Sequence, residues 1–250
     1  MSMSPPVCSS YRNLAVQKLK GLIFSVRSVV AREPAFWLLY QPYIFWDQLK
    51  IKSFIPVRER VVLPDTELVI DGFQGSANSF ATVAFKQSQQ EIVKLAHHMH
   101  SPAQIIQATR RDIPVLLTIR EPQATVLSLT SRWPYISVTA GLRSYIAFYS
   151  KLRPHAPKHV VSTFESTTQH LDQVVQAIND KFDTHFDLVN TAKVNTELKA
   201  KTSAADEAAQ RAPIKAAKRE EFSSERNQQL LERANLVYQS YLPFTHSNNQ

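Results

Sequence analysis

One segment of the chain combines the features that bind phosphate or sulfate through the backbone. Residues 68–80 read as an apolar strand, a turn containing Gly72 and Gly75, and the polar start of a helix. In that order, the amides of the turn and the free amides of the helix start point at one spot and favour an anion there. These two residues are half of the four glycines in the chain, and they permit backbone angles and close approach that a side chain would block. The alternative is an ordinary strand-to-helix turn of an α/β domain.

Two further clusters follow later predicted strands. Arg120 ends one of these strands, and Ser128 lies eight residues further on. Three histidines follow another: His97, His98 and His100. A histidine titrates close enough to neutrality to act as a general base, and an arginine makes charge-assisted forked bonds to a phosphate. The competing interpretations are structural histidines bonded to backbone carbonyls and an arginine paired with a local carboxylate such as Glu121.

The elements that position these groups alternate along the chain. Short apolar strands are predicted at 68–70, 91–97, 114–119 and 159–164, and helices at 79–89, 101–111, 122–132, 142–152 and 171–182. For the helix at 101–111, Ser101, Pro102 and Gln104 supply an N-cap, a first-turn proline and a capping-box partner. Such alternation predicts an α/β fold in which helices cover both faces of a parallel sheet. The candidate residues then lie at the carboxyl ends of strands, where binding sites form in these sheets.

The order and spacing of these clusters resemble those of the P-loop sulfotransferases over residues 66–185. The segment 71–80 is similar to the family's phosphosulfate loop. The segment 120–128 is similar to its R-[DN]-P-x-[DE]-x-x-x-S pattern, with Arg120 and Ser128 at the matching ends. The family often has a catalytic histidine between these two segments. The resemblance therefore implies a three-layer sandwich with a parallel sheet, and a general base among the three histidines.

The resemblance also implies a donor, an acceptor and a set of binding residues. The donor is 3'-phosphoadenosine 5'-phosphosulfate, whose reaction requires no metal, and the acceptor is a hydroxyl or amine of a small molecule or carbohydrate. His98 is the first candidate for the catalytic base, followed by His100 and then His97. Arg219 belongs to a later basic segment of the kind that contacts the 3'-phosphate in the family. The implied nucleotide-binding residues are Gln74, Gly75, Ser76, Ala77, Asn78, Ser79, Arg120, Ser128 and Arg219. Of these, Arg120 and Ser128 match the Arg and Ser that hold the 3'-phosphate of the donor in the family.

The loop departs from the family at a position that carries charge. Gly75 stands where the family has a Lys or Arg that stabilises the leaving group, Gln74 replaces its proline, and Ala77 replaces its glycine. Electrostatic groups of this kind contribute orders of magnitude to the rate. Either another cation reaches in, with the basic residues of 211–219 as candidates, or the protein binds a nucleotide or carbohydrate with little turnover. A P-loop phosphotransferase is a further alternative, although the loop lysine is missing and no predicted strand after the loop ends in a magnesium-binding Asp.

The composition favours anionic partners. The 250 residues carry a formal net charge of +8, which favours nucleotides, sulfated or phosphorylated substrates or an anionic surface, whereas no nucleic-acid-binding motif is present. The single cysteine, Cys8, excludes an internal disulfide. Together with the lack of an evident signal peptide, it predicts a cytoplasmic protein.

We expect two parts in the chain. Residues 1–65 hold a basic amphipathic helix at 11–32 and an aromatic-rich segment, both packed on the core. Residues 66–250 hold the sulfotransferase-like domain, with a mobile basic segment at 191–223 and a last helix at 230–241. The helix at 11–32 either packs its apolar stripe on the core or attaches to a membrane surface. That stripe consists of Ala15, Leu19, Leu22, Ile23, Val26 and Val30.

Overall fold

The structure, a computed structural model, describes residues 7–38, 42, 44, 56–200 and 203–245. Its centre is a parallel four-stranded sheet in the order β2-β1-β3-β4. The strands are β1 (Leu68–Gly72), β2 (Leu95–His97), β3 (Val115–Ile119) and β4 (Val160–Thr163). The central strands β1 and β3 are buried along their whole length. They pair with Val69 opposite Val115 and Gly72 opposite Thr118.

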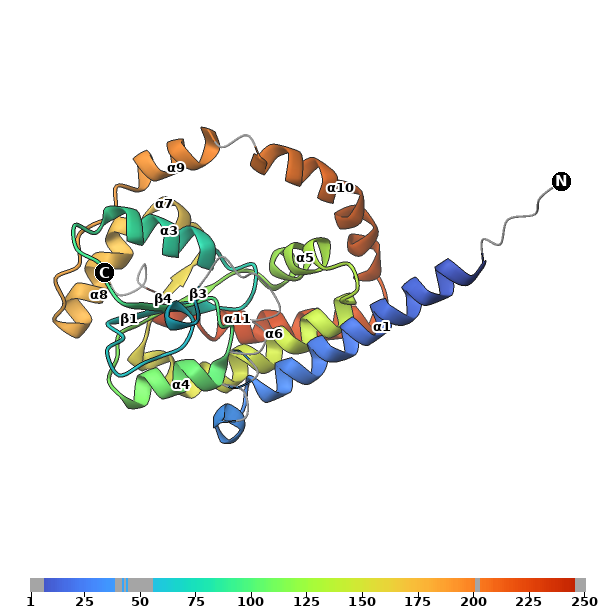
Figure 1. The fold of residues 1–250 in the computed structure, drawn as a ribbon, viewed down its shortest axis with the longest axis horizontal. Coiled ribbons are helices and arrows are strands. Elements are labelled where there is room, and N and C mark those ends of the chain that lie inside the picture. The colour runs from blue at the N-terminus through green and yellow to red at the C-terminus, as the bar shows by residue number, and fades with distance from the viewer. Residues whose placement is uncertain (1–6, 39–41, 43, 45–55, 201–202, 246–250) are drawn as a thin grey trace.

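Helices cover both faces of this sheet (Figure 1). On one side lie α3 (Asn78–Ser88), α7 (Phe164–Gln169) and α8 (Leu171–Phe182), and on the other lie α4 (Pro102–Arg110) and α6 (Val138–Leu152). Successive side chains of a strand point to opposite faces, so each strand serves two apolar cores. Ile70 and Leu116 pack with α3 and α8, whereas Val69 and Leu117 pack with α4 and α6. The predicted α/β class, a parallel sheet flanked by helices, is confirmed.

Three helices form much of the chain after residue 190. The segment 191–223, expected to be mobile, contains α9 (Thr191–Ala200) and α10 (Ser203–Glu221), which form an arch leading down to α5 (Pro122–Arg132) in Figure 1. The expectation rested on the scarcity of large apolar residues, but the Ala, Glu, Lys and Gln of this segment are strong helix formers. α11 (Glu225–Gln239) then packs against α6 and α5. Short 3₁₀ turns occupy Pro34–Phe36, Val57–Glu59, Arg153–Lys158 and Leu242–Phe244.

The N-terminal part contacts the rest of the protein through the C-terminal half of its helix and the residues that follow. α1 (Val7–Val30) lies against α6 and projects away from the body toward its N-terminal end (Figure 1). Trp37 and Ile44 are buried in a small cluster with Ala31 and Met99. The other aromatic residues of that region, at 40, 43, 45 and 46, lie outside the described residues. Among the described helices, none has the length and apolar character needed to cross a membrane.

The start of α4 shows one predicted cap and one wrong prediction. The Ser101 hydroxyl accepts a hydrogen bond from the Gln104 amide at 3.3 Å, as the sequence indicated. The Gln104 side chain does not complete a capping box. It bonds instead to the Val62 amide (3.2 Å) and the Arg60 carbonyl (2.8 Å), and so ties α4 to the segment that precedes β1.

Candidate functional site

The carboxyl ends of the strands surround a cavity of about 190 Å³. The loop after β1 contributes one wall, the turn after β2 a second, and the start and body of α5 a third, as expected where parallel strands end together. Most of the residues singled out in the sequence line this cavity: Gln74, Gly75, Ala77, Asn78, Ser79, His98, His100, Arg120 and Ser128. Ser76, His97 and Arg219 are the exceptions. Arg219 is exposed on α10 and does not line the cavity.

The loop presents backbone amides to the cavity. Gly75 has φ +96° and Ala77 has φ 76°, both in the left-handed region that favours glycine. Within the described part of the chain, the amides of Ala77, Asn78 and Ser79 have no hydrogen-bond acceptor. They belong to the first turn of α3, where amides have no partner inside the helix. The loop therefore offers adjacent donors to an anion.

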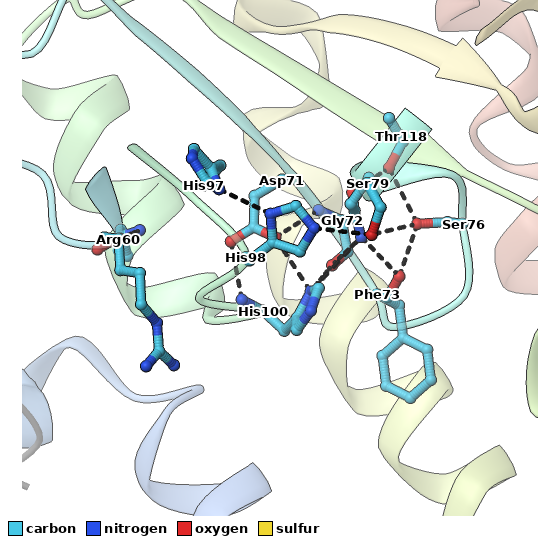
Figure 2. A network of polar contacts seen from close by, with 12 residues as sticks. Arg60, Asp71, Gly72, Phe73, Ser76, Ser79, His97, His98, His100 and Thr118 are labelled. Atoms are coloured by element: carbon cyan, nitrogen blue, oxygen red, sulfur yellow. Dashed lines mark hydrogen bonds and ion pairs between the residues drawn. The ribbon is translucent and has the colours of Figure 1, made fainter. Parts of the chain in front are cut away.

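Buried side chains hold this loop in place (Figure 2). The Ser76 hydroxyl is fully buried, donates to the Phe73 carbonyl at 2.6 Å and lies 2.9 Å from the Thr118 hydroxyl. The side-chain nitrogen of Asn78 donates to the carbonyls of Gly72 and Phe73, and the side-chain oxygen of Asn78 accepts from the Thr118 hydroxyl at 2.6 Å. Both polar atoms of the Asn78 side chain therefore shape the loop, and its backbone amide is the group left for an anion.

Close packing explains the glycine at position 75. A Cβ there would lie 3.2 Å from the Thr125 carbonyl oxygen and from the Ser128 Cβ, and 3.3 Å from the Ser128 hydroxyl. Together with the positive φ, these tight contacts make any side chain at this position strained. Gly75 thus lies directly against α5, next to Ser128.

Arg120 brings a positive charge to the same place. Its guanidinium donates to the Gly75 carbonyl at 3.2 Å and lies 3.8 Å from the centre of the Phe164 ring. Burial lowers the pKa of Arg120 below its ordinary value, although an arginine at this depth stays charged. Arg120 forms no ion pair with any described carboxylate; Glu121 instead caps α5 by accepting from the amides of Gln123 and Ala124.

The three histidines take different roles. Figure 2 shows a chain of contacts from the cavity into the protein. The Ser79 hydroxyl lies 2.9 Å from His98 Nε2, His98 Nδ1 lies 2.7 Å from His97 Nδ1, and His97 Nε2 lies 3.4 Å from a Glu59 carboxylate oxygen. Glu59 also pairs with Lys86, whose hydrogen bond lowers the pKa of the carboxyl. Glu59 is therefore an ionised acceptor.

The Glu59 carboxylate fixes the tautomers of His97 and His98 in this series of hydrogen bonds. An ionised carboxylate only accepts, so His97 donates from Nε2 and accepts at Nδ1. His98 must then donate from Nδ1, which leaves its Nε2 as the acceptor of the Ser79 hydroxyl proton. The nitrogen of His98 that faces the cavity thus carries a lone pair. This is the form that a general base requires.

His98 is held in an unfavourable environment. Burial, followed by the charges of His100 and His97, lowers the pKa of His98 from 6.5 to about 3. Its backbone has φ 57°, and that of His100 has φ 51°, a conformation uncommon outside glycine that gathers at functional sites. His98 is therefore neutral at pH 7.

His100 has a structural role in the loop. Its Nδ1 lies 2.8 Å from the Gly72 carbonyl oxygen, so this nitrogen carries a proton. Its backbone amide donates to Asp71 at 2.8 Å, and the other oxygen of Asp71 lies 3.1 Å from the ring and accepts from the Gly72 amide. Figure 2 shows this group beside the His98 ring. Of the two proposed catalytic histidines, His98 places its acceptor nitrogen beside Ser79 at the cavity, whereas Nδ1 of His100 is used to hold the loop.

No family model, curated protein or solved structure matches this chain.

Three cavity residues were missed in the sequence: Arg132, Trp133 and Phe164. Arg132 could have been found, because it lies four residues after Ser128 on α5 and therefore on the same side of that helix. The alternative cations proposed from the segment 211–219 do not line the cavity. The positive charge at the loop comes instead from Arg120, with Arg132 further along α5.

The cavity offers little to a divalent cation. Asp71, at the end of β1, is fully buried, and its oxygens are taken up by Gly72 and His100. It does not line the cavity. Within the described residues, no group of three or more His, Cys, Asp or Glu side chains is arranged to hold a metal ion.

Proposed function

We propose that this protein transfers a sulfuryl group from 3'-phosphoadenosine 5'-phosphosulfate to a hydroxyl or amine acceptor, with His98 as the general base. The observation that carries the proposal is the meeting of three groups in one cavity: the free amides of the loop, the guanidinium of Arg120, and the lone pair of His98 Nε2. Sulfuryl transfer needs an anion site, a positive charge at the leaving group and a base for the acceptor proton. The cavity contains one of each.

The loop and Arg120 divide the binding of charge between them. The amides of Ala77, Asn78 and Ser79 bind the phosphosulfate, as helix N-termini bind anions elsewhere. Arg120, directly after β3, donates to the Gly75 carbonyl. It supplies the positive charge that a Lys or Arg of the loop supplies in the sulfotransferases. Arg132 lies further along the wall of the cavity, where it is placed to bind the second phosphate of the donor.

His98 takes the acceptor's proton. The acceptor oxygen or nitrogen forms a bond to sulfur, the bond from sulfur to the bridging oxygen breaks, and that electron pair leaves on the phosphate of adenosine 3',5'-bisphosphate. The acceptor's proton moves to His98 Nε2. His97 and Glu59 hold the base in the correct tautomer and stabilise the imidazolium that forms. A positioned base of this kind contributes about 10²- to 10⁴-fold to the rate.

A second candidate is a protein that binds the nucleotide without turnover. The packing at Gly75 favours it, since no cation can be placed on the loop itself. A phosphotransferase is disfavoured, because Asp71 faces away from the cavity and is fully bonded.

Calorimetry with adenosine 3',5'-bisphosphate tests the binding step. We expect saturable binding to the purified protein, weakened about 10- to 100-fold in Arg120→Ala because a charge-assisted hydrogen bond is lost. Arg153→Ala is the matched control, since Arg153 also stacks on an aromatic ring, that of Phe244 at 4.4 Å, but lies away from the cavity. Equal affinity of wild type and Arg120→Ala would remove the support for this assignment.

Transfer of labelled sulfate from the donor to a panel of phenols, sugars and amines tests the chemistry. We expect His98→Gln to lower transfer about 10²- to 10⁴-fold while bisphosphate binding is kept. Tight binding with no transfer to any acceptor would establish the second candidate, and absence of binding would refute both.

A further inference from the structure

α1 turns its apolar side away from the protein. The residues Val16, Leu19, Leu22, Ile23, Val26 and Val29 are between 46% and 60% exposed. At about 100° per residue, they occupy one side of the helix. We call these six residues the apolar stripe. Four of them, Leu19, Leu22, Ile23 and Val26, belong to the set identified in the sequence, and these four do not pack on the core. Val30, also in that set, is partly buried against the cluster that contains Ala31 and Trp37.

The opposite side of α1 makes the contacts with the body. Phe24 packs against the core on the α4 and α6 side of the sheet. Gly21 lies close to the body, because a Cβ there would be 3.1 Å from the Tyr135 carbonyl oxygen. The Ser144 hydroxyl of α6 donates to the Ser28 hydroxyl at 3.3 Å. The Ala31 carbonyl, just after the helix, accepts from Ser101. Apart from Phe24, small and polar residues thus hold the helix in place, and the apolar stripe is left exposed.

Positive charge borders the apolar stripe. Lys18 lies along one edge of it, and Lys20 and Arg27 lie along the other, as their positions on the helix require. Between residues 7 and 32 the sequence contains no Asp or Glu. An apolar side bordered by cations is typical of helices that lie in the plane of a membrane interface.

An open groove of about 480 Å³ runs beside the stripe, between α1 and α6. Val29 belongs to both the stripe and the wall of this groove. The groove is lined by the guanidinium groups of Arg32, Arg143 and Arg226, by several hydroxyls, and by no carboxylate among the described residues. Arg32 pairs with Glu33, whereas Arg143 and Arg226 form no ion pair with any described residue. Such a groove accepts a phosphate-bearing headgroup.

We propose that α1 docks the protein on an anionic membrane surface, with the apolar stripe in the interface and an anionic lipid headgroup in the adjacent groove. Charge decides between this occupant and a second copy of the chain. Two copies meeting through the stripe would bring Lys18, Lys20 and Arg27 against the same residues of the partner, and like charges oppose such contacts. An anionic bilayer instead attracts all of them.

Sedimentation with vesicles tests the proposal and needs no nucleotide, so its result is independent of the enzymatic assignment. The probes are vesicles of phosphatidylcholine alone and vesicles with about a third phosphatidylserine, a fraction that gives the leaflet a negative potential. We expect binding to the anionic vesicles that falls as salt is raised, and little binding to the neutral ones.

Three variants separate the contributions. Leu22→Asp with Val26→Asp should lower binding on the order of a hundredfold, because two apolar side chains no longer enter the bilayer. The matched control is Ile92→Asp with Leu236→Asp, two exposed apolar residues outside α1, which should bind as wild type. Lys18→Glu with Lys20→Glu should lower binding by about fivefold or more for each lysine, and Arg143→Gln should weaken binding to anionic vesicles only.

The proposal is overturned if wild type binds neither vesicle or if the stripe variant binds as tightly as its control. It is also overturned if the protein is a dimer by light scattering that Leu22→Asp with Val26→Asp converts to a monomer, since the stripe is then an interface between two copies. Thermal melts of each variant show that loss of binding is not loss of fold.

Discussion

The protonation of His98 should depend on whether an anion occupies the cavity. In the empty cavity the pKa of His98 is about 3 rather than 6.5. The difference corresponds to a cost of about 5 kcal/mol for placing a proton on the ring. Burial is the main cause of this cost. A negative charge next to the ring attracts the imidazolium and therefore lowers the cost of protonation.

The size of the effect follows from Coulomb's law. One negative charge about 4 Å from the imidazolium, at an effective dielectric constant of about 20, contributes about 4 kcal/mol. That equals about 3 pKa units, and it raises the pKa of His98 from about 3 to about 6. The bound donor would thereby turn a very weak base into one that accepts a proton near neutral pH.

Histidine NMR as a function of pH tests this with sulfate as the anion, because sulfate itself does not titrate in the range used. In sodium chloride we expect the His98 ring to stay neutral down to pH 5, in the tautomer with the proton on Nδ1. In sodium sulfate at equal ionic strength we expect it to titrate near pH 6. His185, exposed and remote from the cavity, should respond equally to both salts.

Two results would refute the reasoning. A His98 ring that titrates between pH 6 and 7 in chloride would mean that burial does not control it. A His98 ring unaffected by sulfate, while the amide signals of Ala77 and Ser79 move, would place the anion away from the base.

Further predictions concern stability. Gly72→Ala would place a Cβ 2.3 Å from the Thr118 carbonyl oxygen, so we expect little folded protein, as judged by circular dichroism of the soluble fraction. The pKa of His159 is lowered by burial from 6.5 to about 3, so its contribution to stability is complete above pH 6.5 and is lost as the pH falls toward 3. The loss amounts to about 1.4 kcal/mol per pH unit. Urea denaturation at pH 7.5 and 5 should therefore show a smaller loss of unfolding free energy at the lower pH in His159→Gln than in wild type. An equal loss in the two proteins would contradict this.

The regular elements were largely readable from the sequence where local signals agreed. α5 and α8 begin and end at the predicted residues, since Pro122 marks the first turn of α5 and α8 has a clear apolar periodicity. β2 was predicted from residue 91 but begins at Leu95. The alternation at Val93, Leu95 and His97 suggested a longer strand, but only the part beside β1 finds a pairing partner.

The site was readable in outline but not in detail. Parallel strands place their carboxyl ends together, so the meeting of loop, histidines and Arg120 followed from the predicted topology. The different roles of the three histidines did not follow from it. They depend on the positive φ of His98 and His100, and on the contact of His97 with Glu59, which lies 38 residues earlier in the sequence. The burial of Ser76 was not predictable for a similar reason, since its hydrogen-bond partner Thr118 lies on β3, 42 residues later.

The glycine at position 75 and the arginine at position 120 are best understood as one feature. With no side chain at 75, α5 approaches the loop closely enough to bring Ser128 beside it, and the Arg120 guanidinium reaches the Gly75 carbonyl. Restoring the family's residue with Gly75→Lys would not restore its charge to the site. At φ +96° the lysine backbone is strained by about 1–3 kcal/mol, and its Cβ meets Thr125 and Ser128.

We therefore expect Gly75→Lys to lower both the free energy of unfolding and the affinity for adenosine 3',5'-bisphosphate, measured by urea denaturation and calorimetry. Gln74→Lys is the control, because Gln74 also lines the cavity but is not in the left-handed region. Added charge at 74 should keep or raise the affinity. If Gly75→Lys instead binds the bisphosphate more tightly than wild type, the loop tolerates a side chain at 75, and Arg120 is not the substitute for the missing cation.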